Sequence, residues 1–373
     1  MNLRGEAVVT PLSSWSTESW QVEKPEKREI PMEEVIAVDW LSKPVAALHR
    51  RPQVLLVNGD LIALSVESWD EEALSGTSPV SPDGPLRIPL EFVRGVILHP
   101  LADLNELALE MERIYSHPAG DDLVALANGD QVRGQMLRLE NGSFLFDRDS
   151  TNVSLVRGQI RSLSLNPELS VTPPEITGGS TLISLTDGSC LTVSNWKRTA
   201  DRLMGSWLGS LAIEIPIDAI AGFRPRGAEM QSLADLAPES YRFVPLLKSA
   251  AVELRRNRNT WGGPLSLGQR PRPEGLGVRS RSETTWRLGG EYKSFIATIG
   301  IDDAAGNQGS SVCRLIVDGT TVYTSPVLRG GEPPIQIPST DVARAQRLQI
   351  IVDFGEEGDV LDLVDVCDAV LLK

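Results

Sequence analysis

The chain has 373 residues, with 36 basic and 50 acidic side chains and a formal net charge of -14. This length favours two or more domains, and an apolar content of 41% is enough to form their cores. The chain contains no run of roughly 18 apolar residues, which excludes a membrane-spanning helix. Its net acidity argues against a nucleic-acid-binding protein. Three cysteines and three histidines supply neither a disulfide framework nor a zinc site, so the composition favours a non-enzymatic protein.

Three short apolar segments end in the same kind of turn. Each closes on Asn-Gly or Asp-Gly, with the glycine at Gly59, Gly129 or Gly188. Both residues of such a pair tolerate positive φ, and apolar residues resume afterwards, so each segment predicts a β-hairpin. We therefore expect one small β unit to be repeated over residues 53–100, 121–165 and 180–225.

The units also share a closing phrase. Ile88-Pro89-Leu90-Glu91-Phe92 resembles Ile215-Pro216-Ile217-Asp218-Ala219, and Leu155-Val156-Arg157 is a third version without the proline. A fourth phrase, Ile30-Pro31-Met32-Glu33-Glu34, has no turn glycine upstream of it at the shared spacing. We therefore expect residues 1–40 to be a partial unit without its opening strand. On this interpretation the native product extends upstream and carries a secretory signal there.

Two connecting segments differ from the β units. A stripe of Leu, Met and Ile recurs at intervals of three and four residues from Leu101 to Ile114. This period predicts an amphipathic helix over residues 101–115, with its stripe used for core packing. The segment Arg224–Ser240 is polar and contains two prolines, so residues 226–242 are predicted to be a linker.

From residue 243 onward, short alternating strands are separated by Gly, Asp and Pro turns. Examples are Ser294–Gly300 and Arg347–Val352. Many short strands at this spacing predict a β-sandwich or jelly roll over residues 243–373. The predicted fold class is therefore all-β, with tandem small hairpin or barrel-like repeat units followed by a C-terminal β-sandwich.

Residues 257–373 resemble the NPCBM family, a carbohydrate-binding module associated with family-98 glycoside hydrolases. The phrases that carry the resemblance are Gly275-Leu276-Gly277-Val278-Arg279-Ser280, Trp286-Arg287-Leu288-Gly289-Gly290-Glu291-Tyr292, Gly300-Ile301-Asp302-Asp303, Val317-Asp318-Gly319 and Gly358-Asp359-Val360-Leu361-Asp362-Leu363. The resemblance implies a galactose-binding-like jelly roll that binds sugar without cleaving it. Arg279 and Leu363 stand where the family usually has histidine, and Val366 where it has tryptophan. These departures bear on sugar binding rather than on the fold.

Sugar rings are held by aromatic faces and by planar polar groups. The candidate carbohydrate-binding residues, each near a matching phrase, are Trp261, Arg279, Trp286 and Tyr292. The alternative for Trp286 and Tyr292 is that they belong to the core, because they alternate in strand-like segments. Trp261 lies in a Gly-rich loop and is open to either interpretation, and Arg279 can instead pair with a carboxylate.

Four acidic residues are candidate ligands of a structural calcium ion, which takes six to eight oxygen ligands. They are Asp302, Asp303, Asp362 and Asp365. The alternative is that these carboxylates cap backbone amides in turns. A glycosidase pair would need two carboxylates across a cleft, which the sequence alone does not single out.

The leading hypothesis is non-catalytic binding of a neutral or anionic glycan or polysaccharide, outside the cytoplasm, in a secreted or periplasmic protein. The alternative is a structural or protein-interaction protein whose jelly roll has lost sugar binding and whose N-terminal repeats bind a protein partner. A glycoside hydrolase is disfavoured, because the assigned repeats leave no room for a catalytic domain of typical size.

Overall fold

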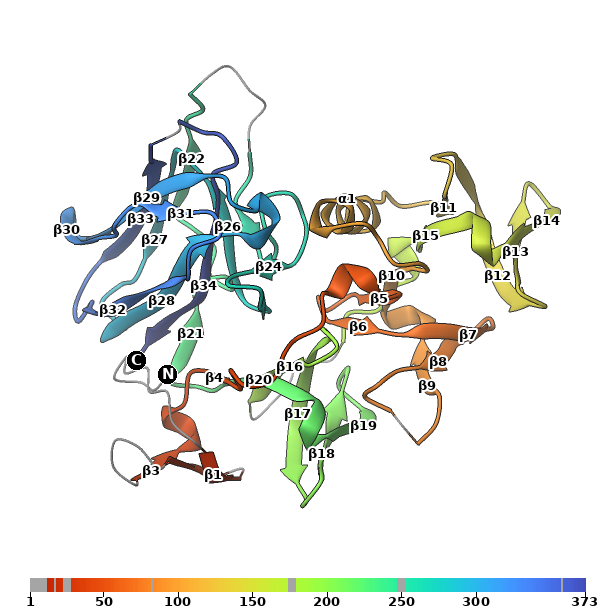
Figure 1. Ribbon diagram of the computed structural model, residues 1–373, viewed down its shortest axis with the longest axis horizontal. Helices are drawn as coiled ribbons and strands as arrows, with labels where there is room; N and C mark the ends of the chain where they lie inside the picture. Colours follow the sequence, from red (N-terminus) through yellow and green to blue (C-terminus); the bar gives the residue numbers. More distant parts are fainter. Residues whose placement is uncertain are drawn as a thin grey trace. The chain divides into compact units, whose positions relative to one another are not determined.

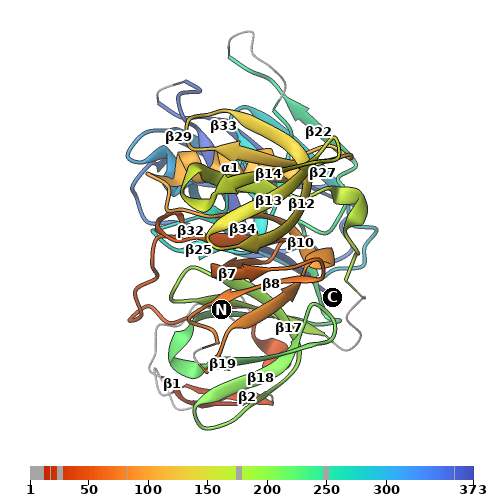
Figure 2. The same ribbon diagram turned by 90° about the vertical axis from the view of Figure 1, so that its right-hand side faces the viewer.

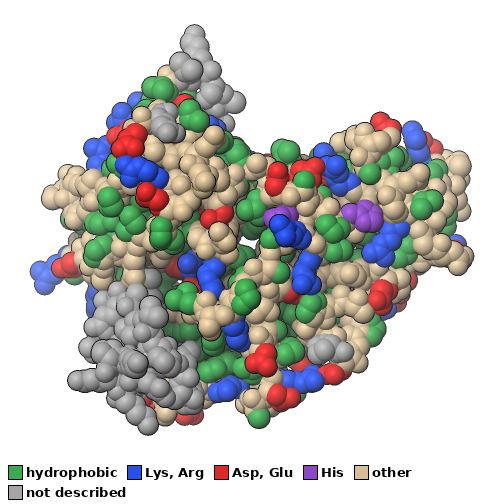
Figure 3. Space-filling model, in the orientation of Figure 1, with side chains coloured by type: hydrophobic (Ala, Val, Ile, Leu, Met, Phe, Trp, Pro, Cys, Tyr) green, Lys and Arg blue, Asp and Glu red, His purple; other side chains and the backbone are tan. Residues whose placement is uncertain are grey.

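The computed structural model describes residues 12–16, 18–22, 28–81, 83–173, 179–246, 252–356 and 358–373. Their regular secondary structure is almost entirely β-strand, as predicted. The described residues divide into two compact units (Figure 1). One unit comprises residues 39–223, and the other comprises residues 224–373 together with the described residues before 39. Basic and acidic side chains are interspersed over the face that Figure 3 shows.

The unit of residues 39–223 contains three modules with a similar order of elements, which we name modules A, B and C (Figures 1 and 2). Module A has one strand more than the other two, because its second strand is divided into two. Module A contains β5 (Gln53–Leu56), β6 (Leu61–Ala63), β7 (Ser65–Trp69), β8 (Ala73–Thr77), β9 (Leu86–Pro89), the 3-10 turn η3 (Leu90–Phe92) and β10 (Val93–Ile97). Module B contains β11 (Asp122–Leu126), β12 (Gln131–Glu140), β13 (Ser143–Arg148), β14 (Thr151–Val156), η4 (Arg157–Gln159) and β15 (Ile160–Ser164). Module C contains β16 (Ser180–Leu185), β17 (Cys190–Arg198), β18 (Arg202–Trp207), β19 (Leu211–Pro216), η6 (Ile217–Ala219) and β20 (Ile220–Arg226). In each module the last strand pairs with the first, which closes the sheet on itself.

The predicted hairpin turns form at all three glycines, which adopt φ of 87°, 93° and 93° at Gly59, Gly129 and Gly188. The Asn or Asp before each glycine fixes the turn, because its side-chain oxygen accepts a hydrogen bond from the backbone N–H two residues on. That distance is 3.1 Å from Asn58 and 2.9 Å from Asp187. The closing phrases form the 3-10 turns that precede the last strands.

The connection between modules A and B contains α1 (Leu104–Tyr115), inside the range predicted for a helix. It begins at Leu104 because Asp103 caps its N-terminus, accepting hydrogen bonds from the backbone N–H groups of Asn105 and Glu106, both at 2.9 Å. Leu107 and Ile114 are fully buried, so the apolar stripe packs against the strands, as expected.

The other unit is built on a β-sandwich of two six-stranded antiparallel sheets. Sheet I has the order β23-β26-β34-β28-β32, with β21 also paired to β34, and sheet II has the order β22-β27-β33-β29-β30, with β31 also paired to β29. The bounds in sheet I are β21 (Met230–Ser232), β23 (Arg255–Arg256), β26 (Gly275–Arg279), β28 (Ser294–Ile301), β32 (Ile335–Asp341) and β34 (Leu363–Leu372). Those in sheet II are β22 (Ser240–Phe243), β27 (Ser282–Arg287), β29 (Ser310–Val317), β30 (Thr320–Thr324), β31 (Leu328–Arg329) and β33 (Arg347–Phe354). A small hairpin joins β24 (Leu265–Ser266) to β25 (Pro271–Arg272), and the short turns η2 (Leu48–Arg50), η5 (Pro167–Leu169) and η7 (Asp303–Ala305) lie in connections.

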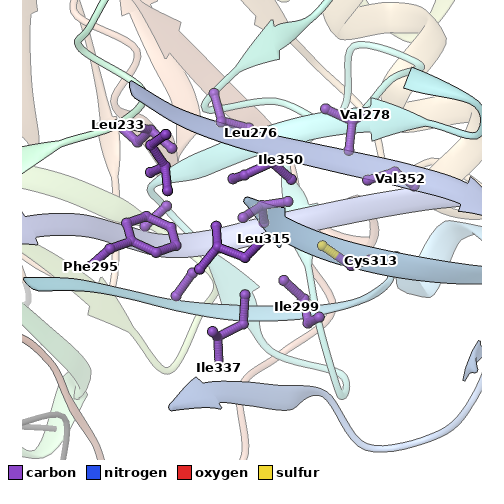
Figure 4. Close-up of a cluster of buried hydrophobic side chains, with 14 of the residues drawn as sticks. Leu233, Leu276, Val278, Phe295, Ile299, Cys313, Leu315, Ile337, Ile350 and Val352 are labelled. Carbon is purple, nitrogen blue, oxygen red and sulfur yellow. The ribbon is translucent and has the colours of Figure 1, made fainter. Parts of the chain in front are cut away.

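The sandwich core lies between the two sheets, where alternate side chains of each strand meet. Figure 4 shows Phe295 and Ile299 of β28 facing Leu315 of β29 and Ile350 of β33, all with at most 3% of their surface exposed. Cys313 belongs to the same cluster, and its thiol is free, as is that of Cys367.

The segment predicted as a linker, residues 226–242, is part of this sandwich instead. It contains β21, which pairs with β34, and most of β22, which pairs with β27. Between the two strands, Leu233 is fully buried in the core. The prediction was wrong because these strands lie at the margins of their sheets, where outward positions are polar and resemble a linker in composition. The sandwich therefore begins before residue 243.

The predicted partial unit, residues 1–40, is only partly described. Its described strands are β1 (Leu12–Trp15), β2 (Ser19–Val22), β3 (Arg28–Pro31) and β4 (Val38–Asp39), with η1 (Met32–Glu34) formed by the closing phrase. The indole rings of Trp15 and Trp20 stack with centroids 5.0 Å apart. Residues 1–11, 17 and 23–27 of the predicted unit lie outside the described residues.

Candidate functional site

The predicted sugar-binding residue Trp261 lies in a loop between β23 and β24 that is fixed by one buried side chain. The Asn259 side-chain oxygen accepts hydrogen bonds from the backbone N–H groups of Trp261, at 3.1 Å, and Gly263, at 2.9 Å. Its side-chain nitrogen donates to Asp302 Oδ1 at 3.2 Å. Trp261 is half-buried against the sandwich core, so part of its ring remains accessible.

Arg279 is the last residue of β26 in sheet I. Its register partner is Leu363, whose carbonyl accepts a hydrogen bond from the Asp302 N–H at 2.8 Å. The Arg279 guanidinium donates to the Asp359 carbonyl at 3.2 Å and is half-buried. The Trp261 loop and Arg279 are therefore linked indirectly, through Asn259, Asp302 and the Leu363 carbonyl.

The other two candidate sugar-binding residues are core residues. Trp286 has 1% of its surface exposed and Tyr292 has 7%, and both pack in the cluster between the sheets. A side chain buried to this extent cannot stack on a sugar ring. Trp286 and Tyr292 are therefore not sugar-binding residues. They belong to the core, which was the alternative interpretation of the sequence.

Three of the four predicted calcium ligands converge on Ser266. The Ser266 N–H donates to Asp302 Oδ2 and to Asp365 Oδ2, both at 3.1 Å, and its hydroxyl donates to Asp303. Asp302 also accepts a hydrogen bond from the Ala304 N–H at 2.8 Å, which caps η7. Most of these carboxyl oxygens therefore already serve as acceptors for protein donors.

Asp362, the fourth predicted ligand, lies apart from this cluster. It accepts a hydrogen bond from the Ser280 hydroxyl and another from the Ser310 N–H at 2.8 Å. Within the ranges that the structure describes, no three His, Cys, Asp or Glu side chains are arranged to hold a metal ion. The four carboxyl groups therefore do not fit a calcium site.

Asp302 and Asp365 instead form a buried carboxyl pair, with at most 1% of either residue exposed. Burial raises the pKa of both, and the neighbouring Asp302 charge raises the pKa of Asp365 further. The raised pKa favours the protonated form of Asp365. The pair supports the Trp261 loop through Asn259.

The two antiparallel sheets define the second unit as a β-sandwich domain. Residues 231–372 match the family model of the NPCBM/NEW2 domain, which confirms the resemblance found in the sequence. A 70-residue segment is 41% identical to the Renibacterium salmoninarum protein named "Putative endo-alpha-N-acetylgalactosaminidase". That segment is 19% of this chain and 5% of the relative, so the chain spans a small part of the relative's length.

Two solved structures are also similar to this chain. One is the CBM51 from Clostridium perfringens GH95 in complex with methyl-galactose, at 19% identity and a TM-score of 0.35, covering 38% of this chain and 99% of that one. The other holds the tandem CBM51 modules of the family 98 glycoside hydrolase from Streptococcus pneumoniae, at 10% identity and a TM-score of 0.34, covering 70% of this chain and 90% of that one. In the described part of the protein, no helix is long and apolar enough to cross a membrane.

Proposed function

We propose that the β-sandwich domain binds a glycan without cleaving it, and that the protein works outside the cytoplasm, secreted or in the periplasm. The observation that carries the proposal is the match of residues 231–372 to the NPCBM/NEW2 domain. The segment shared with a protein named as a glycosidase supports the same class of ligand. We infer that Trp261 and Arg279, which are both half-buried, supply an aromatic face and a planar cation for sugar hydroxyls.

A glycan array at fixed salt concentration tests this proposal. The array would include neutral, sialylated and sulfated glycans, with α-linked N-acetylgalactosamine among the neutral ones. We expect binding by the wild-type protein and reduced binding by Trp261→Ala and Arg279→Ala. Trp40→Ala and Arg87→Ala are controls that remove the same side-chain types, because both residues belong to the unit of residues 39–223 and not to the sandwich domain. Absence of glycan binding by the wild-type protein would reject the proposal.

The non-catalytic part of the proposal needs its own assay. The protein would be incubated with the glycans it binds, and released sugar would be measured. We expect no released sugar. Release that persists after further purification would show that the protein is an enzyme.

A second candidate function is a structural or protein-interaction role. It is favoured by one observation: Trp286 and Tyr292, two of the four candidate sugar-binding residues, are used in the core. In that case the array gives no signal, and modules A, B and C bind a protein partner. Cross-linking of the purified full chain in a culture of its native host separates the two functions. A cross-linked protein partner, together with an array that gives no signal, supports the interaction role.

A further inference from the structure

An open groove of about 710 Å³ lies on sheet II, away from the Trp261 loop. Its volume is in the range of about 300–1,000 Å³ that accommodates small ligands. It is lined by Glu239, Ser240, Thr285, Ile316, Asp318, Gly319, Gln346, Arg347 and Gln349. Thr285, Gln349 and Ile316 are register neighbours on β27, β33 and β29, so they form a continuous row across the outer face of the sheet.

The polar groups in this groove are held in place before any ligand arrives. Arg347 and Glu239 form a bidentate pair, with Nε–Oε2 at 2.7 Å and Nη2–Oε1 at 2.9 Å. The Asp318 carboxylate accepts hydrogen bonds from the backbone N–H groups of Gln346, at 3.0 Å, and Arg347, at 2.8 Å. Gln349 Nε2 donates to the Thr285 hydroxyl at 3.3 Å. Side chains fixed in this way lose little conformational entropy when they bind.

The chemistry of the lining selects the class of ligand. Amides, hydroxyls and carboxylates offer both donors and acceptors to a ligand rich in hydroxyl groups. Ile316 gives apolar contact to the C–H face of a sugar ring. The lining carries two carboxylates and one guanidinium, and that guanidinium is already paired with Glu239. An anionic glycan would therefore meet net negative charge, whereas a neutral glycan would not.

We propose that this groove is a glycan-binding subsite of the domain and that it takes a neutral oligosaccharide. The inference rests on the proposed function, and it adds a location and a charge class that the function does not specify. The inference depends on side chains that point outward from sheet II. On β33, Arg347 and Gln349 point outward because they alternate with the core residues Leu348 and Ile350.

The test measures binding of the best-bound array oligosaccharide to the full chain by calorimetry. The variants are Gln349→Ala and Arg347→Ala, each expected to weaken binding about tenfold, the effect of one or two lost hydrogen bonds. Arg87→Ala is the matched control for Arg347→Ala. Arg87 is likewise exposed and pairs with Asp70 at 3.3 Å and Glu72 at 3.1 Å, in module A. Thermal unfolding of each variant shows that its fold is intact.

The outcomes separate this inference from the proposed function. If the wild-type protein binds no glycan, both fail. If it binds a glycan, and only Trp261→Ala and Arg279→Ala weaken binding, the function stands and the groove subsite is rejected. Equal weakening by Arg347→Ala and Arg87→Ala would show a general charge effect and would also reject the groove subsite. Preference for sialylated or sulfated glycans, with affinity that falls as salt rises, would overturn the neutral ligand class.

Discussion

Asp60 of module A accepts two hydrogen bonds from Thr192 of module C, one from its N–H at 2.9 Å and one from its hydroxyl at 2.7 Å. Trp207 Nε1, also in module C, donates to the same carboxylate at 2.8 Å. In a corresponding contact module A is the donor and module C the acceptor: the Ala63 N–H donates to the Ser189 hydroxyl oxygen at 2.9 Å. Asp60 and Ser189 each follow a turn glycine directly, and Ala63 and Thr192 are each the fourth residue after it. Modules A and C therefore meet through a local two-fold relation.

Loss of this carboxylate is expected to destabilise the modules. Asp60→Ala leaves the buried donors of Thr192 and Trp207 without an acceptor, and should lower the free energy of unfolding by about 2–4 kcal/mol. Urea denaturation measures the change. Asp130→Ala is the control, because Asp130 follows the turn glycine of module B in the same way but is exposed. It should change stability by less than about 0.5 kcal/mol. Equal effects of the two substitutions would contradict the role of Asp60.

The ion pair between Arg224 and Asp368 is also expected to stabilise the sandwich domain. Nε of Arg224 lies 2.6 Å from Oδ1 of Asp368, and Arg272 reaches the second carboxylate oxygen at 3.4 Å. Both members of the main pair are nearly inaccessible, at 3% and 4% side-chain exposure. Asp368→Ala removes the buried carboxylate with which the Arg224 guanidinium pairs and should cost about 3–5 kcal/mol.

The control for this pair is Glu140→Ala, which breaks the exposed pair with Arg138. It should cost less than about 1 kcal/mol in the same denaturation experiment. A small effect of Asp368→Ala would mean that the Arg224 charge is solvated in the folded protein.

The Asp302–Asp365 pair should make stability depend on pH. Its pKa is raised in the folded state, mainly by burial, so the folded protein holds a proton that the unfolded chain releases above about pH 4. The stabilisation is complete below that pH and is lost as the pH rises through the folded pKa, by at most about 1.4 kcal/mol per pH unit. Asp365→Asn replaces the proton with an amide donor and should flatten this dependence. An unchanged profile in that variant, measured by denaturation between pH 4 and 7, would contradict the raised pKa of Asp365.

The cysteines should differ in reactivity towards a thiol reagent. Burial raises the pKa of Cys313 to about 12 and raises that of Cys367 well above its ordinary value. Both should resist alkylation until the protein unfolds, since the thiolate is the reactive form. Cys190, at the start of β17, is half-buried and should react first. Mass spectrometry of the alkylated native protein measures the order, and early labelling of Cys313 would show that the sandwich opens locally.

Sequence and structure determine different parts of this protein. The hairpin turns at Gly59, Gly129 and Gly188 are predictable, because a turn depends on the backbone freedom of two adjacent residues. The domain family is predictable for a similar reason, since its phrases are short and ordered along the chain. The pairing of Asp60 with Thr192 is not predictable, because it joins residues that are distant in the sequence.

The candidate site shows the same division. The residue types named from the sequence are those that bind sugars and metal ions. In the structure, Trp286 and Tyr292 lie in the core, and Asp302 and Asp365 form a buried carboxyl pair. The groove around Gln349 arises only when β27, β33 and β29 lie side by side. The sequence by itself determined the turns, the strand periodicity and the family. Only the tertiary structure decided which polar and aromatic side chains face a ligand, because exposure depends on the stacking of strands from distant parts of the chain.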